Sequence, residues 1–141
     1  MSVQDKGEWP RTGIYATFTV ESVDKTMDWY QRMLGWEVGK DAFDGNGNCT
    51  LGSVIYGYHA IKFARGGGNP LYNYRNVVMM IDVLDVDGLY EAIFGKGGRP
   101  LDKPKEESWG GRTFTIEDPN GLTLMFVQLP DEERNLSEGY R

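Results

Sequence analysis

The sequence is poor in cysteine and histidine, with one of each among 141 residues, and it has no long apolar run. A single cysteine, Cys49, excludes an internal disulfide and is typical of a reducing compartment. The apolar stretches are far shorter than the roughly 20 residues of a membrane-spanning helix, and the first ten residues lack the apolar run of a signal peptide. We therefore expect a cytoplasmic protein with no membrane partner.

Basic residues are also scarce. The chain has 15 Lys and Arg against 21 Asp and Glu, a net charge of -6. This balance argues against a nucleic-acid partner, because binding to the phosphate backbone needs clustered basic side chains. An acidic protein favours a cationic ligand, although the same charge also serves simple solubility.

The first half of the chain begins with an alternating run and an amphipathic helix. Polar and apolar residues alternate from Gly13 to Val20, which predicts a strand. Ser22 is a good N-cap, apolar residues recur at helical spacing from Val23 to Leu34, and Gly35 is placed to end the helix.

Three further strands are predicted before the middle of the chain. Trp36 to Phe43 and Cys49 to Ile55 form a hairpin through Asp44 to Asn48, a stretch rich in turn residues. A strand from about Tyr58 to Ala64 follows, and Gly66 to Pro70 then breaks regular structure.

The second half repeats the first. Val83 to Asp87 matches Val20 to Asp24, and Gly98 matches Gly35, both 63 positions later. A second strand and helix are thus expected from about Val77. Three more strands are expected around 99–104, 112–117 and 122–128, with a turn at 118–121.

These elements predict an α+β fold of two tandem βαβββ modules, which form a curved mixed sheet around a cleft with the helices outside. We expect a single domain over 1–141, with an internal repeat of 13–65 and 76–129 and a polar tail at 130–141. Strand alternation assigns one set of side chains to the helices: Ala16, Phe18, Val20, Ile61, Phe63, Val77, Met79, Ile81, Phe114, Ile116, Leu124 and Phe126.

Two segments carry a family resemblance. Residues 20–36, VESVDKTMDWYQRMLGW, and residues 109–126, WGGRTFTIEDPNGLTLMF, resemble the vicinal oxygen chelate superfamily of glyoxalases, bleomycin-resistance proteins and extradiol dioxygenases. The resemblance covers about residues 13 to 128, and it implies the two-module fold deduced above.

In metal-dependent members, the resemblance implies ligands on the first and last strands of each module. At those positions this sequence has Tyr15, Lys62, Val78 and Met125. The 63-residue repeat relates Tyr15 to Val78 and Lys62 to Met125. Valine and methionine are not hard metal ligands, and a lysine ammonium repels a cation. We therefore expect neither a metal nor another cofactor, unless the true ligands lie elsewhere.

The strand face opposite the helices is expected to line the cleft. It would present Tyr15, Thr17, Thr19, Ala60, Lys62, Val78, Met80, Thr113, Thr115, Glu117, Thr123, Met125 and Val127. An apolar floor with scattered hydroxyls suits a small organic ligand. The alternative is that the same residues fill a collapsed cleft as ordinary core.

Four residues invite more specific roles. Lys62 and Glu117 are candidates for proton transfer if the cleft shifts their pKa values, or else they pair with each other or sit at the rim. Trp109 either stacks on a planar ligand or anchors its own turn. His59 falls on the helix side of its strand, which favours a structural or rim position.

The leading functional hypothesis is metal-independent binding of an aromatic or cationic, antibiotic-like molecule, as in bleomycin-resistance proteins. The ligand-binding candidates are Tyr15, Thr17, Lys62, Val78, Met80, Trp109, Thr113, Thr115 and Met125. One alternative is an enzyme: a metal-free isomerase, lyase or cyclase using Lys62, Glu117 or Tyr15, or a metal-dependent lyase or dioxygenase with displaced ligands. Another is a non-catalytic regulatory module. The family resemblance also implies a homodimer, with modules paired within or between chains.

Overall fold

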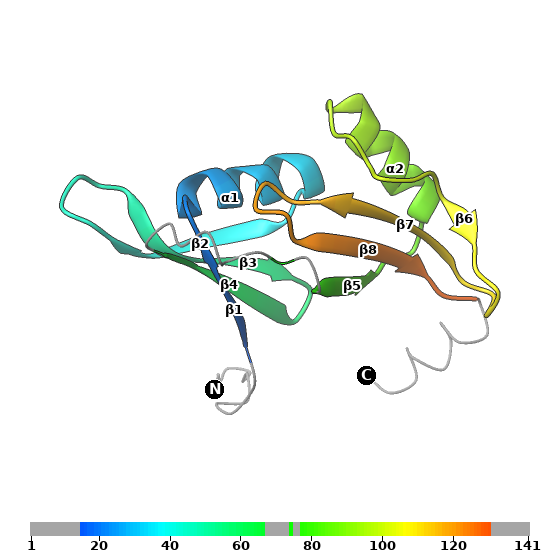
Figure 1. Ribbon diagram of the computed structural model, residues 1–141, viewed down its shortest axis with the longest axis horizontal. Helices are drawn as coiled ribbons and strands as arrows, with labels where there is room; N and C mark the ends of the chain where they lie inside the picture. Colours follow the sequence, from blue (N-terminus) through cyan, green and yellow to red (C-terminus); the bar gives the residue numbers. More distant parts are fainter. Residues whose placement is uncertain (1–14, 67–73, 75–76, 131–141) are drawn as a thin grey trace.

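The computed structural model describes residues 15–66, 74 and 77–130. They form two helices and two four-stranded sheets, an α+β fold of two tandem modules as predicted. Both helices lie on the same side of the strands (Figure 1). Among the described residues, the opposite face of each sheet carries no helix.

The first module follows the predicted order of elements. It contains β1 (Ala16–Val20), α1 (Val23–Trp29), a π-helical turn η1 (Tyr30–Leu34), β2 (Glu37–Phe43), β3 (Cys49–Tyr56) and β4 (His59–Arg65). The sheet order is β1-β4-β3-β2, and β1 runs parallel to β4.

The helix of the first module begins and ends where the sequence predicts. The Ser22 hydroxyl accepts a hydrogen bond from the Lys25 amide at 3.2 Å, which caps the first turn. Gly35 ends the element with φ of 72°, a left-handed conformation that favours glycine.

The second module repeats the topology. It contains β5 (Val78–Asp82), α2 (Val86–Gly95), β6 (Lys105–Glu106), β7 (Arg112–Glu117) and β8 (Thr123–Gln128), in the order β5-β8-β7-β6. The predicted turn at 118–121 is confirmed, since the Asp118 amide donates to the Leu122 carbonyl at 2.9 Å.

Two local predictions in this module are wrong. Residues 99–104 do not form a strand; β6 is a two-residue segment further on. Pro100 and Pro104 have no amide hydrogen to donate. Asp102 Oδ1 accepts a hydrogen bond from the Thr115 amide at 2.7 Å, so a side chain takes the part of a backbone carbonyl in the pairing with β7. Gly98 does not end the helix, because Gly97 takes the positive φ of 91° and Gly98 packs against Ile93.

The core lies between the helices and the sheets. Most of the predicted helix-facing residues are buried or half-buried, and Phe63, Phe114 and Leu124 are 0% exposed. Ala16 and Val77 are exposed, because they lie at or before the open ends of β1 and β5. The buried residues of both modules form one continuous hydrophobic cluster.

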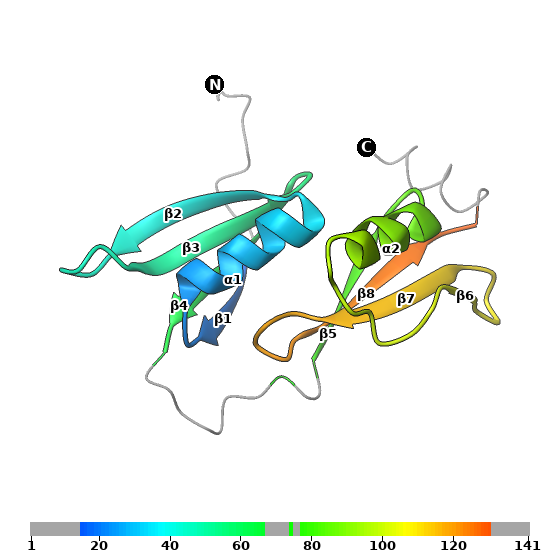
Figure 2. The same ribbon diagram turned by 90° about the horizontal axis from the view of Figure 1, so that it is seen from above.

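The two modules lie side by side, each with its own helix (Figure 2). Polar side chains join them. The Tyr30 hydroxyl donates to Asp118 Oδ2 at 2.8 Å, and Asn120 Nδ2 donates to Thr26 Oγ1 at 3.0 Å. The turn that follows β7 is thereby fixed to α1. Lys96 Nζ donates to the Met33 carbonyl at 3.4 Å, and these two residues are 63 positions apart, equivalent in the repeat.

Several predictions concern parts of the chain outside the described residues, including the break at 67–70 and the tail from 131 onwards. In the part that is described, no helix is long and apolar enough to span a membrane.

Candidate functional site

The sheet face without helices is the candidate functional site, and we call it the open face. Strand alternation places the predicted cleft residues on it, and three of its large apolar side chains are well exposed. Tyr15 is 58%, Val78 51% and Met80 62% exposed. Val78 and Met80 stand at alternate positions of β5, and apolar side chains left in water in this way are typical of a binding surface.

The four places where the resemblance implies metal ligands fall on paired strands. Lys62 lies on β4, which pairs with β1, and Met125 lies on β8, directly beside Met80 of β5. Tyr15 and Val78 stand just before and at the start of β1 and β5. Across residues 15–66, 74 and 77–130, no group of three His, Cys, Asp or Glu side chains is placed to hold a metal ion.

Lys62 is part of a polar triad on the open face, which we define as Asp41, Ser53 and Lys62. Lys62 Nζ lies 3.2 Å from Asp41 Oδ2 and 3.0 Å from Ser53 Oγ. The Ser53 hydroxyl also lies 2.9 Å from the same carboxylate oxygen. The side chains of Lys62 and Asp41 are 34% and 38% exposed, whereas Ser53 is 8% exposed. Charged groups thus stand at the surface above a buried hydroxyl.

Strand register assembles the triad. Ser53 of β3 pairs directly with Lys62 of β4, so both side chains lie on the same face. On β2, Gly39 pairs with Ser53, so alternation places Asp41, two residues later, on the same face, while Lys40 between them points to α1 and pairs with Asp24. Asp41 and Ser53 were not among the predicted site residues. The hairpin of β2 and β3 was predicted, but not the register that sets Asp41 and Ser53 beside Lys62.

The equivalent region of the second module is more apolar, and its Thr115 hydroxyl already has a hydrogen-bond partner. Met80, Met125 and Thr115 lie side by side on β5, β8 and β7. The Thr115 hydroxyl donates to Asp102 Oδ1 at 3.1 Å. Burial opposes ionisation of Asp102, but bonds from the Thr115 amide and from Lys105 outweigh it and lower the pKa of Asp102 below its usual value.

Thr113 lies deeper than predicted. It is 1% exposed, and its hydroxyl donates to Glu107 Oε2 at 2.6 Å. A ligand would have to displace Glu107 to reach it. By contrast, Thr17 lies in register with Lys62 and is exposed beside it.

The remaining candidates do not join one cluster. Glu117 is exposed at the end of β7, and Lys62 pairs with Asp41 instead of with Glu117. Trp109 is 47% exposed and covers Gly111, where an added Cβ would lie 1.9 Å from the indole. The indole therefore contacts its own turn while keeping a surface for a ligand. His59 is exposed at the start of β4, and Cys49 is 1% exposed in the core.

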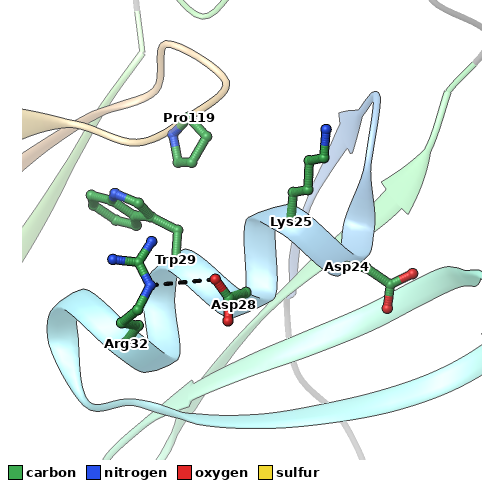
Figure 3. Close-up of a pocket in the computed structure, with 6 residues that line it drawn as sticks. All are labelled: Asp24, Lys25, Asp28, Trp29, Arg32 and Pro119. Carbon is green, nitrogen blue, oxygen red and sulfur yellow. Dashed lines mark hydrogen bonds and ion pairs between the residues drawn. The ribbon is translucent and has the colours of Figure 1, made fainter.

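A depression lies on the helix side of the molecule (Figure 3). It has a volume of about 420 Å³ and is bounded by Asp24, Lys25, Asp28, Trp29, Arg32 and Pro119. Arg32 and Asp28 pair across one helical turn at 3.4 Å, and their side chains are 54% and 67% exposed. The lining is mainly charged side chains, and the exposed pair adds little to stability.

Comparison with known proteins identifies the fold. Residues 14–126 match the model of the Glyoxalase/Bleomycin resistance protein/Dioxygenase superfamily. A glyoxalase-related enzyme from Clostridium phytofermentans gives a TM-score of 0.70 at 18% identity, covering 86% of this chain and 98% of that one. No curated protein matches the sequence.

Two other solved structures show the same likeness. A superfamily member from Sphaerobacter thermophilus DSM 20745 gives a TM-score of 0.65 at 21% identity, covering 84% of this chain and 98% of that one. TioX from Micromonospora sp. ML1 gives 0.68 at 17% identity, covering 84% and 99%. At such identities the likeness establishes the fold alone.

Proposed function

Since the chain belongs to the Glyoxalase/Bleomycin resistance protein/Dioxygenase superfamily, we propose that it binds a small organic molecule on the open face, without a metal. The observation that carries this proposal is the exposure of Val78 and Met80 on β5 and of Tyr15 at the start of β1. Lys62 and Met125 at the expected ligand positions support a metal-free site, because neither suits a divalent cation.

We further propose that a second copy of the chain covers the open face. A sheet whose apolar side chains remain in water gains free energy when another layer packs on it. The two modules are repeats, so two copies related by a twofold axis can place the first module of each against the second module of the other. Such a pairing encloses a cleft lined on one side by Lys62 and on the other by Met80 and Met125.

An enzyme on the same scaffold is the second reading. Its candidates Lys62, Tyr15 and Glu117 share the open face, but Lys62 is engaged with Asp41 and Glu117 is exposed. Among the described residues, Asp41 is the only ionisable side chain in contact with Lys62. The triad therefore supports binding more directly than proton transfer.

The dimer is tested by replacing Met80 with Asp. A carboxylate on the open face disfavours its burial by a second copy, so light scattering coupled to size exclusion should show a dimer for wild type and a monomer for Met80→Asp. Phe94→Asp is the control, because Phe94 is 49% exposed on α2, on the opposite side of the sheet. A dimer that survives Met80→Asp would contradict closure through the open face.

Metal independence is tested by elemental analysis of tag-free protein, with thermal-shift titrations of zinc, nickel, manganese and iron. We expect no stoichiometric metal and no saturable stabilisation by any of the four ions. Stoichiometric metal would overturn the metal-free assignment and favour a lyase or dioxygenase.

A further inference from the structure

The polar triad has a specific hydrogen-bond arrangement that restricts what it binds. A lysine ammonium only donates, so Lys62 donates to both Asp41 Oδ2 at 3.2 Å and Ser53 Oγ at 3.0 Å. The Ser53 hydrogen then goes to Asp41 Oδ2 at 2.9 Å. Asp41 thus accepts from both partners, and the three side chains form a closed triangle.

The closed triangle and the burial of Ser53 disfavour a nucleophilic role for its hydroxyl. A serine nucleophile needs a base that accepts its proton while its oxygen stays open to the substrate. Here the Ser53 oxygen accepts from Lys62, and Ser53 itself is 8% exposed. Ser53 instead positions the ammonium from below.

One donor of the ammonium is left for a ligand. Lys62 has three N–H groups, and its contacts within the described residues use two of them. The lysine side chain is 34% exposed on the open face, with Thr17 in register beside it on β1. Because Asp41 and Ser53 hold the ammonium, little rotamer freedom remains to be lost on binding.

We propose that the third N–H of Lys62 anchors an oxygen acceptor of the ligand, a carbonyl or a single carboxylate on a flat apolar body. This inference rests on the proposed function and names its substrate class. The ammonium stands where metal-dependent relatives are expected to place a ligand, and it offers a positive charge to a ligand oxygen directly. Because the remaining N–H only donates, it does not suit a cationic group that also only donates, although the net charge of -6 pointed to a cationic ligand.

The repeat makes the site polar at one end only. The position equivalent to Lys62 in the second module is Met125, which lies beside Met80 and offers no donor. A ligand with one oxygen end and one apolar end therefore matches the two halves of the site better than a symmetric ligand.

The experiment compares three naphthalene probes of similar shape by titration calorimetry on the intact chain: 2-naphthoate, 2-acetylnaphthalene and 2-ethylnaphthalene. We expect the two oxygenated probes to bind about tenfold more tightly than the hydrocarbon, as one charge-assisted hydrogen bond provides. Lys62→Met keeps an unbranched apolar chain and removes the donor, so the preference should vanish while the hydrocarbon still binds.

Lys40→Met is the matched control. Lys40 neighbours Asp41 on β2 and also forms a 3.2 Å ion pair, but with Asp24 of α1 on the helix side. The oxygen preference should survive this substitution. The two oxygenated probes separate the sources of the acceptor, because a preference for naphthoate alone identifies a carboxylate and a shared preference identifies any carbonyl oxygen.

Two results would overturn the inference in distinguishable ways. Equal binding of all three probes, unaffected by Lys62→Met, would remove Lys62 as the anchor and leave the ligand site intact. No binding of any probe, to wild type or variants, would remove the proposed site itself.

Discussion

Tyr30→Phe removes one hydroxyl from the junction between the modules. Tyr30 is 0% exposed, and its hydroxyl donates to Asp118 Oδ2 at 2.8 Å. Asp118 is 5% exposed, and its other oxygen already accepts from the amides of Asn120 and Leu122 at 2.7 and 3.0 Å. Phenylalanine preserves the ring contacts, so only the bond across the junction is lost.

The magnitude follows from burial and charge. A hydrogen bond to a charged group contributes about 1.5–3 kcal/mol, and an acceptor left buried without its partner adds to the cost of removing it. We expect Tyr30→Phe to lower the free energy of unfolding by about 2–3 kcal/mol. For a domain of this size that corresponds to a fall in melting temperature of roughly 6–12 °C.

The same tyrosine gives the prediction a pH signature. Burial, reinforced by the charge of Asp118 and the hydrogen bond to it, raises the pKa of Tyr30 far above its usual 10.0. A raised pKa gives stability that is complete below pH 10 and lost above it, because only the unfolded chain then releases the proton. Above pH 10 the wild type should therefore lose about 1.4 kcal/mol per pH unit relative to Tyr30→Phe.

Urea unfolding followed by circular dichroism measures both effects, at pH 8 and at steps from pH 10 to 11.5. Tyr15→Phe is the control, because Tyr15 is 58% exposed and its replacement should change stability by less than about 0.5 kcal/mol. Equal stability of wild type and Tyr30→Phe at pH 8, or a difference that does not narrow above pH 10, would refute the reasoning.

Two further substitutions test local packing and charge. Gly98→Ala places a Cβ 2.5 Å from Ile93 Cγ2 and should lower the free energy of unfolding by about 1–3 kcal/mol in chemical denaturation. In the control Gly95→Ala, the new Cβ meets nothing within 4 Å, so the change should be neutral or stabilising. Equal effects of the two substitutions would contradict the close approach at Gly98. The Arg65 guanidinium, with turn amides, lowers the pKa of Asp44 from 3.8 to about 2, which favours the fold above pH 3.8 and loses that effect as the pH falls towards 2. Arg65→Gln should raise this pKa towards 3.8 in a carbon-13 NMR titration of the carboxyl group, and an unchanged value would show that Arg65 is not its main cause.

Most of the fold was readable from the sequence because its signals are local. The cap at Ser22, the helix end at Gly35 and the strand Arg112–Glu117 lie where spacing and turn chemistry predict them. The 63-residue repeat then predicted the topology, because matching positions in the two halves indicate the same order of elements. The predicted strand at 99–104 failed because Asp102 replaces a backbone partner by its side chain, which no periodicity reveals.

The candidate site was predicted only in part, since its chemistry depends on register. Alternation assigned Lys62 to the face without helices, but its contact with Asp41 depends on the pairing register of β2, β3 and β4. The expected alternative partner, Glu117, lies on a strand of the other sheet. Pairing between charged side chains on different strands requires the three-dimensional register, which the sequence pattern does not contain.

The contact between Lys96 and Met33 bears on how the protein responds to dilution. These residues are equivalent in the repeat, and their meeting at 3.4 Å is the kind of contact that a twofold dimer makes between two chains. Here the polypeptide links both halves, so their association is intramolecular and dilution does not separate them. The open face has no such link: if a second copy covers it, closure obeys mass action, and ligand affinity should weaken when the protein is diluted below its dimer dissociation constant.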